Sequence, residues 1–532
     1  MTGSSAQQDI KINAEAFSWP IEFSRRRSEP GATRATRLVA RRLIALPSLI
    51  LLPLVQRWIP LALIGFVALW LRTCDLARRP MHADEANQAV KTGELLEHGA
   101  YVYDPADHHG PTLYYAVLPV AWLRGQHSLA TLTETTVRLV PALAGTVAVL
   151  LLAALAAPLG RGPALIAAGL MAVSPPAVYY SRYFIQETLL VAFTLAAFVC
   201  ASQWWRQGKL GWALATGACL GLMQATKASA GLFLLAAALA AVLAPARSPA
   251  SSRRRRDGLF AAGAALVVWI LFQSSFGTNP AGIRDAFTAL GRASTRLAGG
   301  SGHEKPWTYY LGLFGWQRVG GVLWEQMVFS ALACGGLGVA AFTRQPFLRW
   351  AAFYTLVIVT VFSLTPYKTP WHAIHFVPGL ALLAAGALAA IRRLHTGRIV
   401  AAAVGFGCVA SLTHQTWRAA FIRPADERNP YAYVHSSPDV LKFRALADAA
   451  LADFPDRPVR IISEEYWPLP WYLRGLPSVG YWSAPPADCD GTLVIASAAQ
   501  AGTVRARLQG RYQESILGLR PGVLCVVFTA IR

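Results

Sequence analysis

Two adjacent carboxylates, Asp84 and Glu85, stand in a polar stretch that directly follows the first long apolar run of the chain. A carboxylate at a boundary between water and an apolar phase can act as a general base, because partial burial and a neighbouring acid raise its pKa. The alternative is a solvated loop acid or a helix cap, which is the commoner role for an isolated Asp-Glu pair. The pair is therefore a candidate site only if other polar residues gather around it.

Three further residues have the chemistry to complete such a site. Glu187 begins a later apolar run, five residues after Arg182. Arginine can bind a phosphate through two parallel hydrogen bonds, while an acid at the start of a helix also interacts favourably with the helix dipole. Lys368 lies between two prolines at the end of another apolar run. A lysine there either contacts an anion or extends toward the interface, so both roles stay open.

Composition identifies the kind of protein that must position these residues. Of 532 residues, 54% are hydrophobic and 14% charged, whereas a soluble chain carries roughly a quarter charged residues. The net charge of +21 does not indicate nucleic-acid binding, because the basic residues fall in short clusters between apolar runs. We therefore predict an α-helical polytopic membrane protein surrounded by membrane lipids, with no nucleic-acid partner.

The apolar runs predict about eleven crossings, since a spanning helix needs about 20 mostly apolar residues. The N-terminal residues 1–56 carry seven arginines and lack the pattern of a cleaved signal, which indicates a cytoplasmic arm followed by an interfacial segment. A transmembrane domain is predicted for residues 57–415. The predicted runs are 57–72, 137–157, 164–180, 188–205, 211–226, 229–245, 258–276, 321–343, 349–365, 372–391 and 398–413.

Basic residues occupy every second connection between these runs, as expected for cytoplasmic loops. The alternation requires that the apolar stretch 113–123, which is short and contains a proline, stay at the outer surface. The acidic residues then collect on one side, although the orientation argument used only basic ones. The predicted outer features are the loop 73–136, the stretch 181–187, Lys227, the loop 277–320 with Lys305, and the stretch 367–371.

Histidines also fall on the predicted outer side. His82, His109 and His303 are candidates for contacts to substrate or to a divalent metal, because histidine and carboxylate are suitable ligands. No spacing matches a specific metal signature, so a metal is possible but not indicated. Lys227, Lys305 and Lys368 run against the usual placement of lysines on the inner side, and this makes them better candidates for anion contacts than the inner arginines.

The composition becomes that of a soluble protein near residue 416, which predicts a small extracytoplasmic α/β domain over 416–532. Within it, 439–454 and 498–508 are predicted as helices, and 459–462, 492–495 and 523–528 as strands. Cys489 and Cys525 lie in this polar region, the one part of the chain where a disulfide is conceivable.

The ordered motifs resemble a known superfamily. His82-Ala83-Asp84-Glu85-Ala86, then His109 to Tyr115, then Ser181-Arg182-Tyr183 with Glu187, are similar to the protein O-mannosyltransferases and aminoarabinose transferases. These are glycosyltransferases of the GT-C type, including family 39. The resemblance covers about residues 57–415. The stretches 367–371 and 467–474 look closer to a prokaryotic branch named flippase-activity-associated membrane proteins, and that likeness extends through the C-terminal domain.

The resemblance implies a GT-C fold and transfer of a sugar from a polyprenyl-phosphate-linked donor to an acceptor hydroxyl on a protein or glycolipid. Asp84 would be the general base, Glu85 would support it, and Glu187 would be a second acid. Arg182, Lys368 and Lys305 would contact the donor phosphate. The site would face the extracytoplasmic side of the cell (inner) membrane.

Two other functions remain open at this point. The branch name leaves room for a non-catalytic component that assists translocation or presentation of lipid-linked glycans. An ion-coupled transporter is less well supported, because it would need acids or broken helices near mid-membrane. The sugar, the acceptor and the oligomeric state are not specified by the sequence.

Overall fold

The computed structural model describes residues 58–107, 109–244, 252–299, 302–343 and 345–532. The arm predicted for residues 1–56 lies outside the described residues. By its contacts the chain divides into Met1–Ile59 and a second compact unit, Pro60–Arg532. The features below belong to this second unit, except that its first helix, Trp58–Thr73, begins two residues earlier.

Six helices among the described residues are long and apolar enough to cross a membrane. A seventh span is possible where α5 and α6 pass the same test together, although they are bent by 58° at a short break. Each of the eleven predicted apolar runs contains a helix, so the predicted helical membrane fold is confirmed, while the number of crossings stays a prediction. The spans are α4 (Glu134–Leu155), α7 (Glu187–Gln207), Arg254–Gln273 of α10 (Ser252–Gln273), α14 (Pro346–Leu364), Pro370–Ile391 and Gly397–Ile422.

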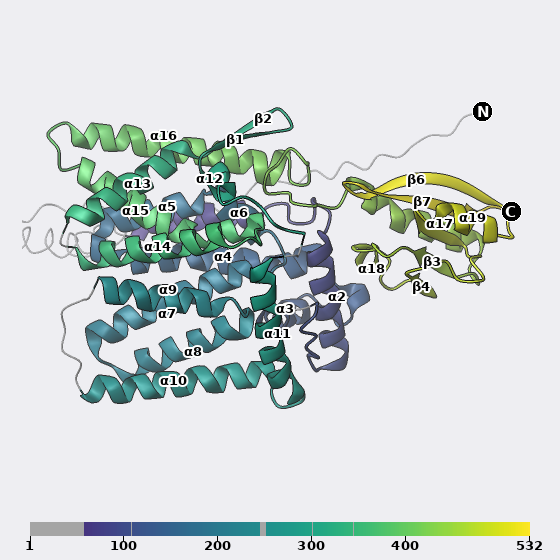
Figure 1. The fold of residues 1–532 in the computed structure, drawn as a ribbon, viewed down its shortest axis with the longest axis horizontal. Coiled ribbons are helices and arrows are strands. Elements are labelled where there is room, and N and C mark those ends of the chain that lie inside the picture. The colour runs from purple at the N-terminus through teal and green to yellow at the C-terminus, as the bar shows by residue number, and fades with distance from the viewer. Residues whose placement is uncertain (1–57, 108, 245–251, 300–301, 344) are drawn as a thin grey trace, which may run out of the picture. The chain divides into compact units, whose positions relative to one another are not determined.

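The helices of the bundle approach closely where glycines face a neighbour. α8 (Leu210–Thr226) runs beside α10 (Figure 1) and carries Gly217 and Gly221 one turn apart on the contact. A Cβ on Gly217 would lie 2.0 Å from the carbonyl oxygen of Ala261, so only glycine fits there. Small residues four apart let helix backbones pack in lipid without an aqueous driving force.

Short elements connect the spans and carry the polar residues. α3 is a 12-residue helix with Pro119 inside it, which matches the stretch predicted not to cross. The other elements of this part of the chain are α2 (Ala83–His98), α3 (Thr112–Leu123), α5 (Arg161–Ala172), α6 (Pro175–Ser181), α9 (Ala230–Leu243), α11 (Ala281–Ala298), α12 (Tyr309–Phe314), β1 (Trp316–Val319), β2 (Val322–Glu325) and α13 (Met327–Phe342). The span Pro370–Ile391 consists of η3 (Pro370–His375) and α15 (Val377–Ile391), and the span Gly397–Ile422 consists of α16 (Gly397–Trp417) and η4 (Arg418–Ile422).

The C-terminal residues form a five-stranded sheet of order β4-β3-β5-β7-β6. β3 is parallel to β4 and β5, and β7 is antiparallel to β5 and β6. The predicted strand 459–462 is confirmed as β3, whereas β4 and β6 were not predicted. The elements are α17 (Lys442–Asp453), β3 (Val459–Ile462), α18 (Leu469–Tyr472), β4 (Val479–Trp482), β5 (Leu493–Ser497), α19 (Ala501–Arg507), β6 (Tyr512–Arg520) and β7 (Val523–Ala530).

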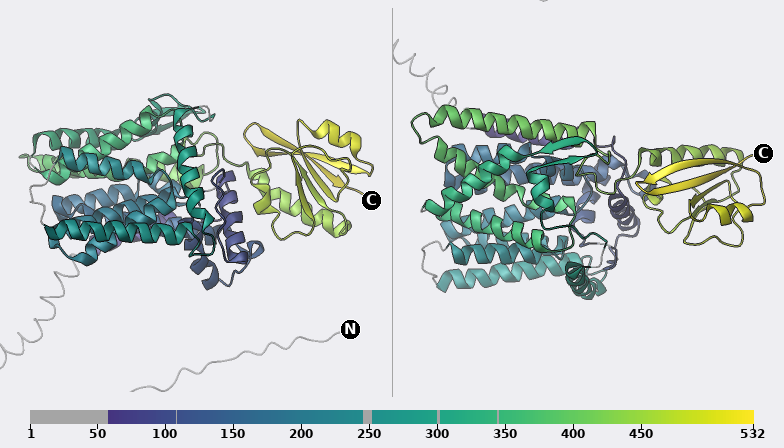
Figure 2. Two further views of the ribbon diagram at one scale, coloured as in Figure 1. Left: turned by 60° about the horizontal axis from the view of Figure 1, so that its bottom comes forward. Right: turned by 45° about the horizontal axis from the view of Figure 1, so that its top comes forward.

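Alternate residues of the central strands bury opposite faces of this sheet. Ile461 and Ile495 pack with α17, while Val494 and Phe528 pack with α19. Figure 2 shows the sheet between these two helices. Cys489 and Cys525 are free thiols that belong to these two different clusters, so the disulfide considered for them does not form.

The helix α18 joins the sheet domain to the membrane domain. Its Trp471 donates a 2.7 Å hydrogen bond from Nε1 to Glu134 at the start of α4, and the hydroxyl of Tyr472 accepts one of 2.8 Å from the amide of Met81. Both residues are buried in one apolar cluster with α2 and α3. The Trp-Pro-Leu-Pro-Trp-Tyr stretch therefore serves mainly as packing against the segment that carries Asp84.

Candidate functional site

The start of α2 separates the two adjacent carboxylates. His82 caps this helix: its Nδ1 accepts a 3.1 Å hydrogen bond from the amide of Asp84, and Glu85 accepts one of 3.1 Å from the amide of His82. This reciprocal cap turns Glu85 inward, where its side chain is fully buried, and leaves the Asp84 side chain 52% exposed. The two acids therefore face different surroundings.

Glu85 is saturated by partners from three segments. Its oxygens accept hydrogen bonds of 3.0 Å from Arg79 and 2.9 Å from Arg138, and the amide of Phe184 donates another of 2.9 Å. Burial alone would raise the pKa of Glu85, but the charges of Arg138 and Arg79 outweigh it and hold the pKa at about 2. These contacts fix α2 against α4 and the turn before α7, which is a structural arrangement.

Asp84, by contrast, has no arginine or lysine partner among the described residues. Its nearest titratable neighbour is His82, with Nδ1 3.9 Å from Oδ2. The Nδ1 atom already accepts the amide hydrogen of Asp84, so Nε2 carries the ring proton and donates it to the carbonyl of Tyr433 at 3.1 Å. Asp84 is thus a half-exposed carboxylate whose backbone is held firmly.

Lys368 is a buried cation without an acid beside it. The residue is 1% exposed, and its Nζ donates hydrogen bonds to the carbonyl of Lys305, at 2.9 Å, and to the carbonyl of Thr365. No carboxylate pairs with it in the part of the chain that the structure describes. Burial lowers the pKa of Lys368, because desolvation penalises the charged form.

A short antiparallel contact holds this lysine beside the 303–305 stretch. The amide of Lys368 donates to the carbonyl of His303 at 3.1 Å, and the amide of Lys305 donates to that of Pro366 at 3.2 Å. The ammonium of Lys305 lies 4.8 Å from the ring centroid of Tyr433, which gives a cation–π contact. Two predicted phosphate-binding lysines therefore lie together.

Tyr433 connects these lysines to the start of α2. Its hydroxyl lies 2.9 Å from Nδ1 of His303, and its carbonyl accepts from His82. The ring of Trp371 packs edge-on against the rings of His82 and Tyr433, with centroid distances of 6.1 Å and 6.0 Å. The structure thus brings together five predicted site residues, Asp84, His82, His303, Lys305 and Lys368.

The segment that carries Tyr433 was not predicted to belong to the site. Val434 adopts φ of +46°, which is a strained conformation for a β-branched residue and is often found where function requires it. His435 is buried, and its Nε2 has no hydrogen-bond partner among the described residues. Its ring lies 5.7 Å from that of His82, and burial followed by the charges of Arg79 and His82 lowers its pKa well below 6.5. Only the presence of a histidine could have pointed to this segment.

Glu187 forms a second buried ion pair, with Lys227 at the end of α8. Its helix, α7, packs against η3, the segment that contains Trp371. His109 reaches the same end of α8, because Gly110 beside it packs against the backbone of Ala225. The predicted acid and the outer lysine are therefore partners of each other and lie next to the Trp371 segment.

Arg182 is placed differently from the lysines. Its guanidinium donates to the carbonyls of Leu71 at 3.1 Å, Cys74 at 2.5 Å and Asp75 at 3.0 Å. It therefore satisfies the unpaired carbonyls at the end of the helix Trp58–Thr73. No hydrogen bond or ion pair joins it to Lys305 or Lys368 within the described residues. Its predicted contact with the donor phosphate stays a prediction.

The histidines do not assemble into a metal centre in the described part of the chain, where no group of three or more potential ligands lies close enough to hold an ion. Both ring nitrogens of His82 are already used in contacts with the backbone. His82 therefore fits a hydrogen-bonding role better than metal ligation.

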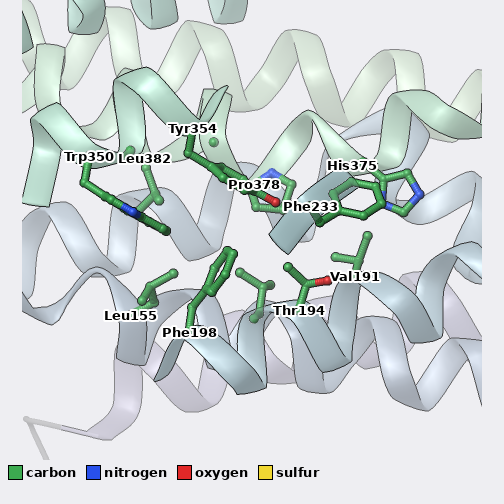
Figure 3. Close-up of a pocket in the computed structure, with 13 residues that line it drawn as sticks. Leu155, Val191, Thr194, Phe198, Phe233, Trp350, Tyr354, His375, Pro378 and Leu382 are labelled. Atoms are coloured by element: carbon green, nitrogen blue, oxygen red, sulfur yellow. The ribbon is translucent and has the colours of Figure 1, made fainter. Parts of the chain in front are cut away.

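An apolar groove runs along the spans beside this region. It contains about 420 Å³ of empty space, part of which is open to its surroundings, and is bounded by α4, α7, α9, α14 and α15. Figure 3 shows Phe198, Phe233, Trp350 and Tyr354 around it, with His375 of η3 at one end. The groove has the lining and shape expected for a hydrocarbon chain and ends at the segment that carries Trp371.

Comparisons with known proteins agree with this architecture. Residues 116–274 match the family model described as dolichyl-phosphate-mannose-protein mannosyltransferase. ArnT from Cupriavidus metallidurans, solved bound to undecaprenyl phosphate, has a TM-score of 0.61 and 15% identity, covering 88% of this chain and 97% of that one. The Archaeoglobus fulgidus oligosaccharyltransferase tethered with an acceptor peptide has a TM-score of 0.51 and 12% identity, over 88% and 74% of the two chains.

A third structure, the oligosaccharyltransferase AglB from Archaeoglobus fulgidus with an inhibitory peptide and dolichol-phosphate, has a TM-score of 0.50 and 11% identity, over 87% of this chain and 73% of that one. No curated protein sequence matches the chain. The closer likeness to the flippase-activity-associated branch stays a prediction. The family-model match and the shared fold confirm the predicted resemblance to the glycosyltransferases of the GT-C superfamily.

Proposed function

We propose that the protein transfers a sugar from a polyprenyl-phosphate-linked donor to an acceptor hydroxyl, with Asp84 as the general base. One observation carries this proposal. The backbone of Asp84, a half-exposed carboxylate, is held by the His82 cap, and His82 is linked through Tyr433 and the 303–305 stretch to Lys368, a buried ammonium without a carboxylate partner among the described residues. A base and a fixed positive charge are the two groups that this transfer requires.

The chemistry places the two groups on either side of the sugar. Departure of the phosphate gives the anomeric carbon oxocarbenium character, and the attacking hydroxyl must lose its proton as the new bond forms. Asp84 takes that proton. Lys368 and Lys305 stabilise the negative charge that develops on the departing lipid phosphate, and they need no reorganisation because both are already held in place. A lipid phosphate needs no nucleotide site.

The groove of Figure 3 supports a polyprenyl donor. Its aromatic and aliphatic lining fits a hydrocarbon chain, and its end at His375 leads to η3, which follows Lys368 directly in the chain. The ArnT structure contains undecaprenyl phosphate and the AglB structure contains dolichol-phosphate. We infer that the tail of the donor lies in this groove with its phosphate toward the lysines.

The side of the membrane follows from the loops. We propose that the site and the C-terminal domain face the extracytoplasmic side of the cell (inner) membrane, because the connections at the opposite ends of the spans carry the arginine clusters. The acceptor is a hydroxyl of a protein or a glycolipid that reaches Asp84 from the aqueous side.

Substitution of the base tests the proposal. The assay measures transfer of label from undecaprenyl-phosphate-[14C]mannose to acceptors in membranes from cells that do not make the protein. Asp84→Asn should lower this transfer by about 10²–10⁴-fold, the range typical of a general base. Glu94→Gln is the matched control, because it changes an exposed acid of the same helix that pairs only with Lys91. Sustained transfer by Asp84→Asn would remove Asp84 from the mechanism. Absence of any product with wild-type protein, together with altered sidedness of the glycolipid, would favour the translocation function.

A further inference from the structure

A second basic hollow lies at the ends of the helix Trp58–Thr73, α6 and η4. It contains about 310 Å³ of empty space, part of which is open to solvent, and is bounded by three arginines together with Asp75, Leu76, Tyr179, Ala420 and Pro424. The arginines are Arg78, Arg79 and Arg182. We call this hollow the arginine pocket.

Positive charge exceeds negative charge around this pocket. Arg79 shares the single carboxylate of Glu85 with Arg138, and among the described residues the hydrogen bonds of Arg182 go to carbonyls and to no carboxylate. Burial, followed by repulsion from Arg79 and Arg138, lowers the pKa of Arg182 to about 10. The remaining acid, Asp75, is exposed and lies 3.7 Å from Arg78. The pocket therefore favours an anion that its own carboxylates do not supply.

The pocket is distinct from the lysine pair of the transfer site. The residues that bound the pocket do not include Lys305, Lys368, His82 or Tyr433. The two regions approach each other at Tyr183, whose ring is stacked under the guanidinium of Arg79 at 3.5 Å and lies 6.0 Å from the ring of His82, and at Glu85, which accepts from both Arg79 and the amide of His82. A ligand in the arginine pocket would therefore lie apart from the two lysines that we propose hold the donor phosphate.

Aromatic side chains place the pocket at the lipid–water boundary. Trp70 and Trp417 stack with centroids 6.0 Å apart and are 44% and 43% exposed. Phe421 stacks on Trp417 at 4.5 Å, and its ring lies 4.6 Å from the guanidinium of Arg182. Exposed tryptophans mark the interface of a membrane protein. The same two helices expose Phe66 and Phe406 along their length, which is a surface suited to acyl chains.

We propose that the arginine pocket binds the phosphate headgroup of a membrane lipid whose acyl chains lie along the helix Trp58–Thr73 and α16. Arginine holds phosphate oxygens through paired, charge-assisted hydrogen bonds, and the anion compensates the excess charge of Arg78, Arg79 and Arg182. A phosphomonoester lipid fits best, because it offers the most charge and the most acceptor oxygens. This site is independent of the transfer reaction.

Quenching of tryptophan by brominated lipid tests this site. The full chain is placed in nanodiscs of phosphatidylcholine that contain either dibromo-phosphatidic acid or dibromo-phosphatidylcholine at the same mole fraction. We expect stronger quenching by the phosphatidic acid, and Trp70→Phe should remove part of the difference. Arg78→Glu should weaken the apparent affinity about tenfold, which corresponds to about 1.4 kcal/mol.

The matched control is Arg284→Glu, since Arg284 is also an exposed arginine beside an aspartate, Asp285. Arg78→Gln is the second variant if charge reversal disturbs folding. It removes the charge without reversing it, and the fold should tolerate it because the Arg78 side chain is 62% exposed. Equal quenching by the two lipids, or an equal response of the Arg78 and Arg284 variants, would overturn the proposal. Displacement of the brominated phosphatidic acid by millimolar inorganic phosphate would assign the pocket to soluble phosphate instead.

Discussion

Two regions of the molecule bury cations, and they treat them in opposite ways. Around Glu85, the guanidinium groups of Arg79 and Arg138 meet a fully buried carboxylate that also accepts two backbone amides. Around Lys368, the hydrogen bonds of the ammonium within the described residues go to carbonyl oxygens, and the nearby Lys305 adds a second positive charge. The first region contains a carboxylate and is complete in its hydrogen bonds, whereas the second has no carboxylate partner among the described residues.

The difference separates structural charges from functional ones. A buried ion pair with all its hydrogen bonds made fixes the geometry of its neighbours, and removal of one partner leaves an uncompensated charge. A buried cation without an acid is stabilised when an anionic ligand arrives. Asp84 and Glu85 are adjacent in the chain but belong to different classes. The His82 cap leaves the side chain of Asp84 exposed to water and turns that of Glu85 toward the arginines.

The largest effect is expected from breaking the complete region. Glu85→Gln leaves Arg79 and Arg138 buried without an anion, and it should cost about 3–5 kcal/mol of stability. A strongly lowered thermal midpoint of the detergent-purified protein, or its loss from membranes, would show this. The exposed Glu94→Gln on the same helix should behave as wild type. A normal midpoint for Glu85→Gln would mean that the network is not the anchor of α2.

Acid should weaken the same region in the intact protein. The pKa of Glu85 is about 2 in the folded chain, below its ordinary 4.5. A carboxyl group whose folded pKa is depressed contributes stability that is complete above the unfolded pKa and is lost as the pH falls toward the folded one. The advantage in thermal midpoint of wild type over Glu85→Gln should therefore shrink below about pH 4.5. An advantage that stays constant down to pH 3 would contradict the assignment.

Substitution of Lys368, in the region that lacks an acid, should change the activity and not the stability of the protein. Lys368→Met removes a buried charge that has no acid partner among the described residues, and this gain offsets the loss of its hydrogen bonds to the carbonyls of Lys305 and Thr365, so the thermal midpoint should change little. The KM for the polyprenyl-phosphate donor should rise about 10–100-fold, since a hydrogen bond to a charged group contributes about 1.5–3 kcal/mol. Lys442→Met, an exposed lysine of the C-terminal domain, is the control. A collapsed midpoint with an unchanged KM would show that Lys368 is structural.

The fold could be predicted because long apolar runs and buried strands have strong signals of their own. Each run gave a helix, and β3 falls at the predicted residues because Val459, Ile461 and Ile462 are all buried. β6 was missed because its first residues are polar and exposed, and the four-residue β4 contains Gly480. Neither shows the alternation or the continuous apolar run by which strands are recognised.

The site was only partly predictable. Asp84, the lysines and the histidines were identified by residue type and by the side of the membrane to which their loops were assigned. The partners of Glu85 could not be found, because Arg138 lies 53 residues away in a span and only the folded chain brings it close. Tyr433 and His435 were missed for the same reason: their segment has no motif, and its role comes from its position between His82 and Lys305.

The smallest expected effect concerns the contact between the sheet domain and the segment that carries Asp84. Tyr472→Phe removes the hydroxyl that accepts from the amide of Met81, next to His82, and should cost about 1 kcal/mol, the usual net value of a hydrogen bond. Tyr512→Phe removes a comparable hydroxyl bonded to Asp490 within the sheet domain. Both variants should lose a little stability, but only Tyr472→Phe should lower kcat for transfer, because only it loosens the segment that holds Asp84. Equal kcat values for the two variants would mean that the sheet domain does not position the base, and that the cap at His82 and the Glu85 network hold α2 without it.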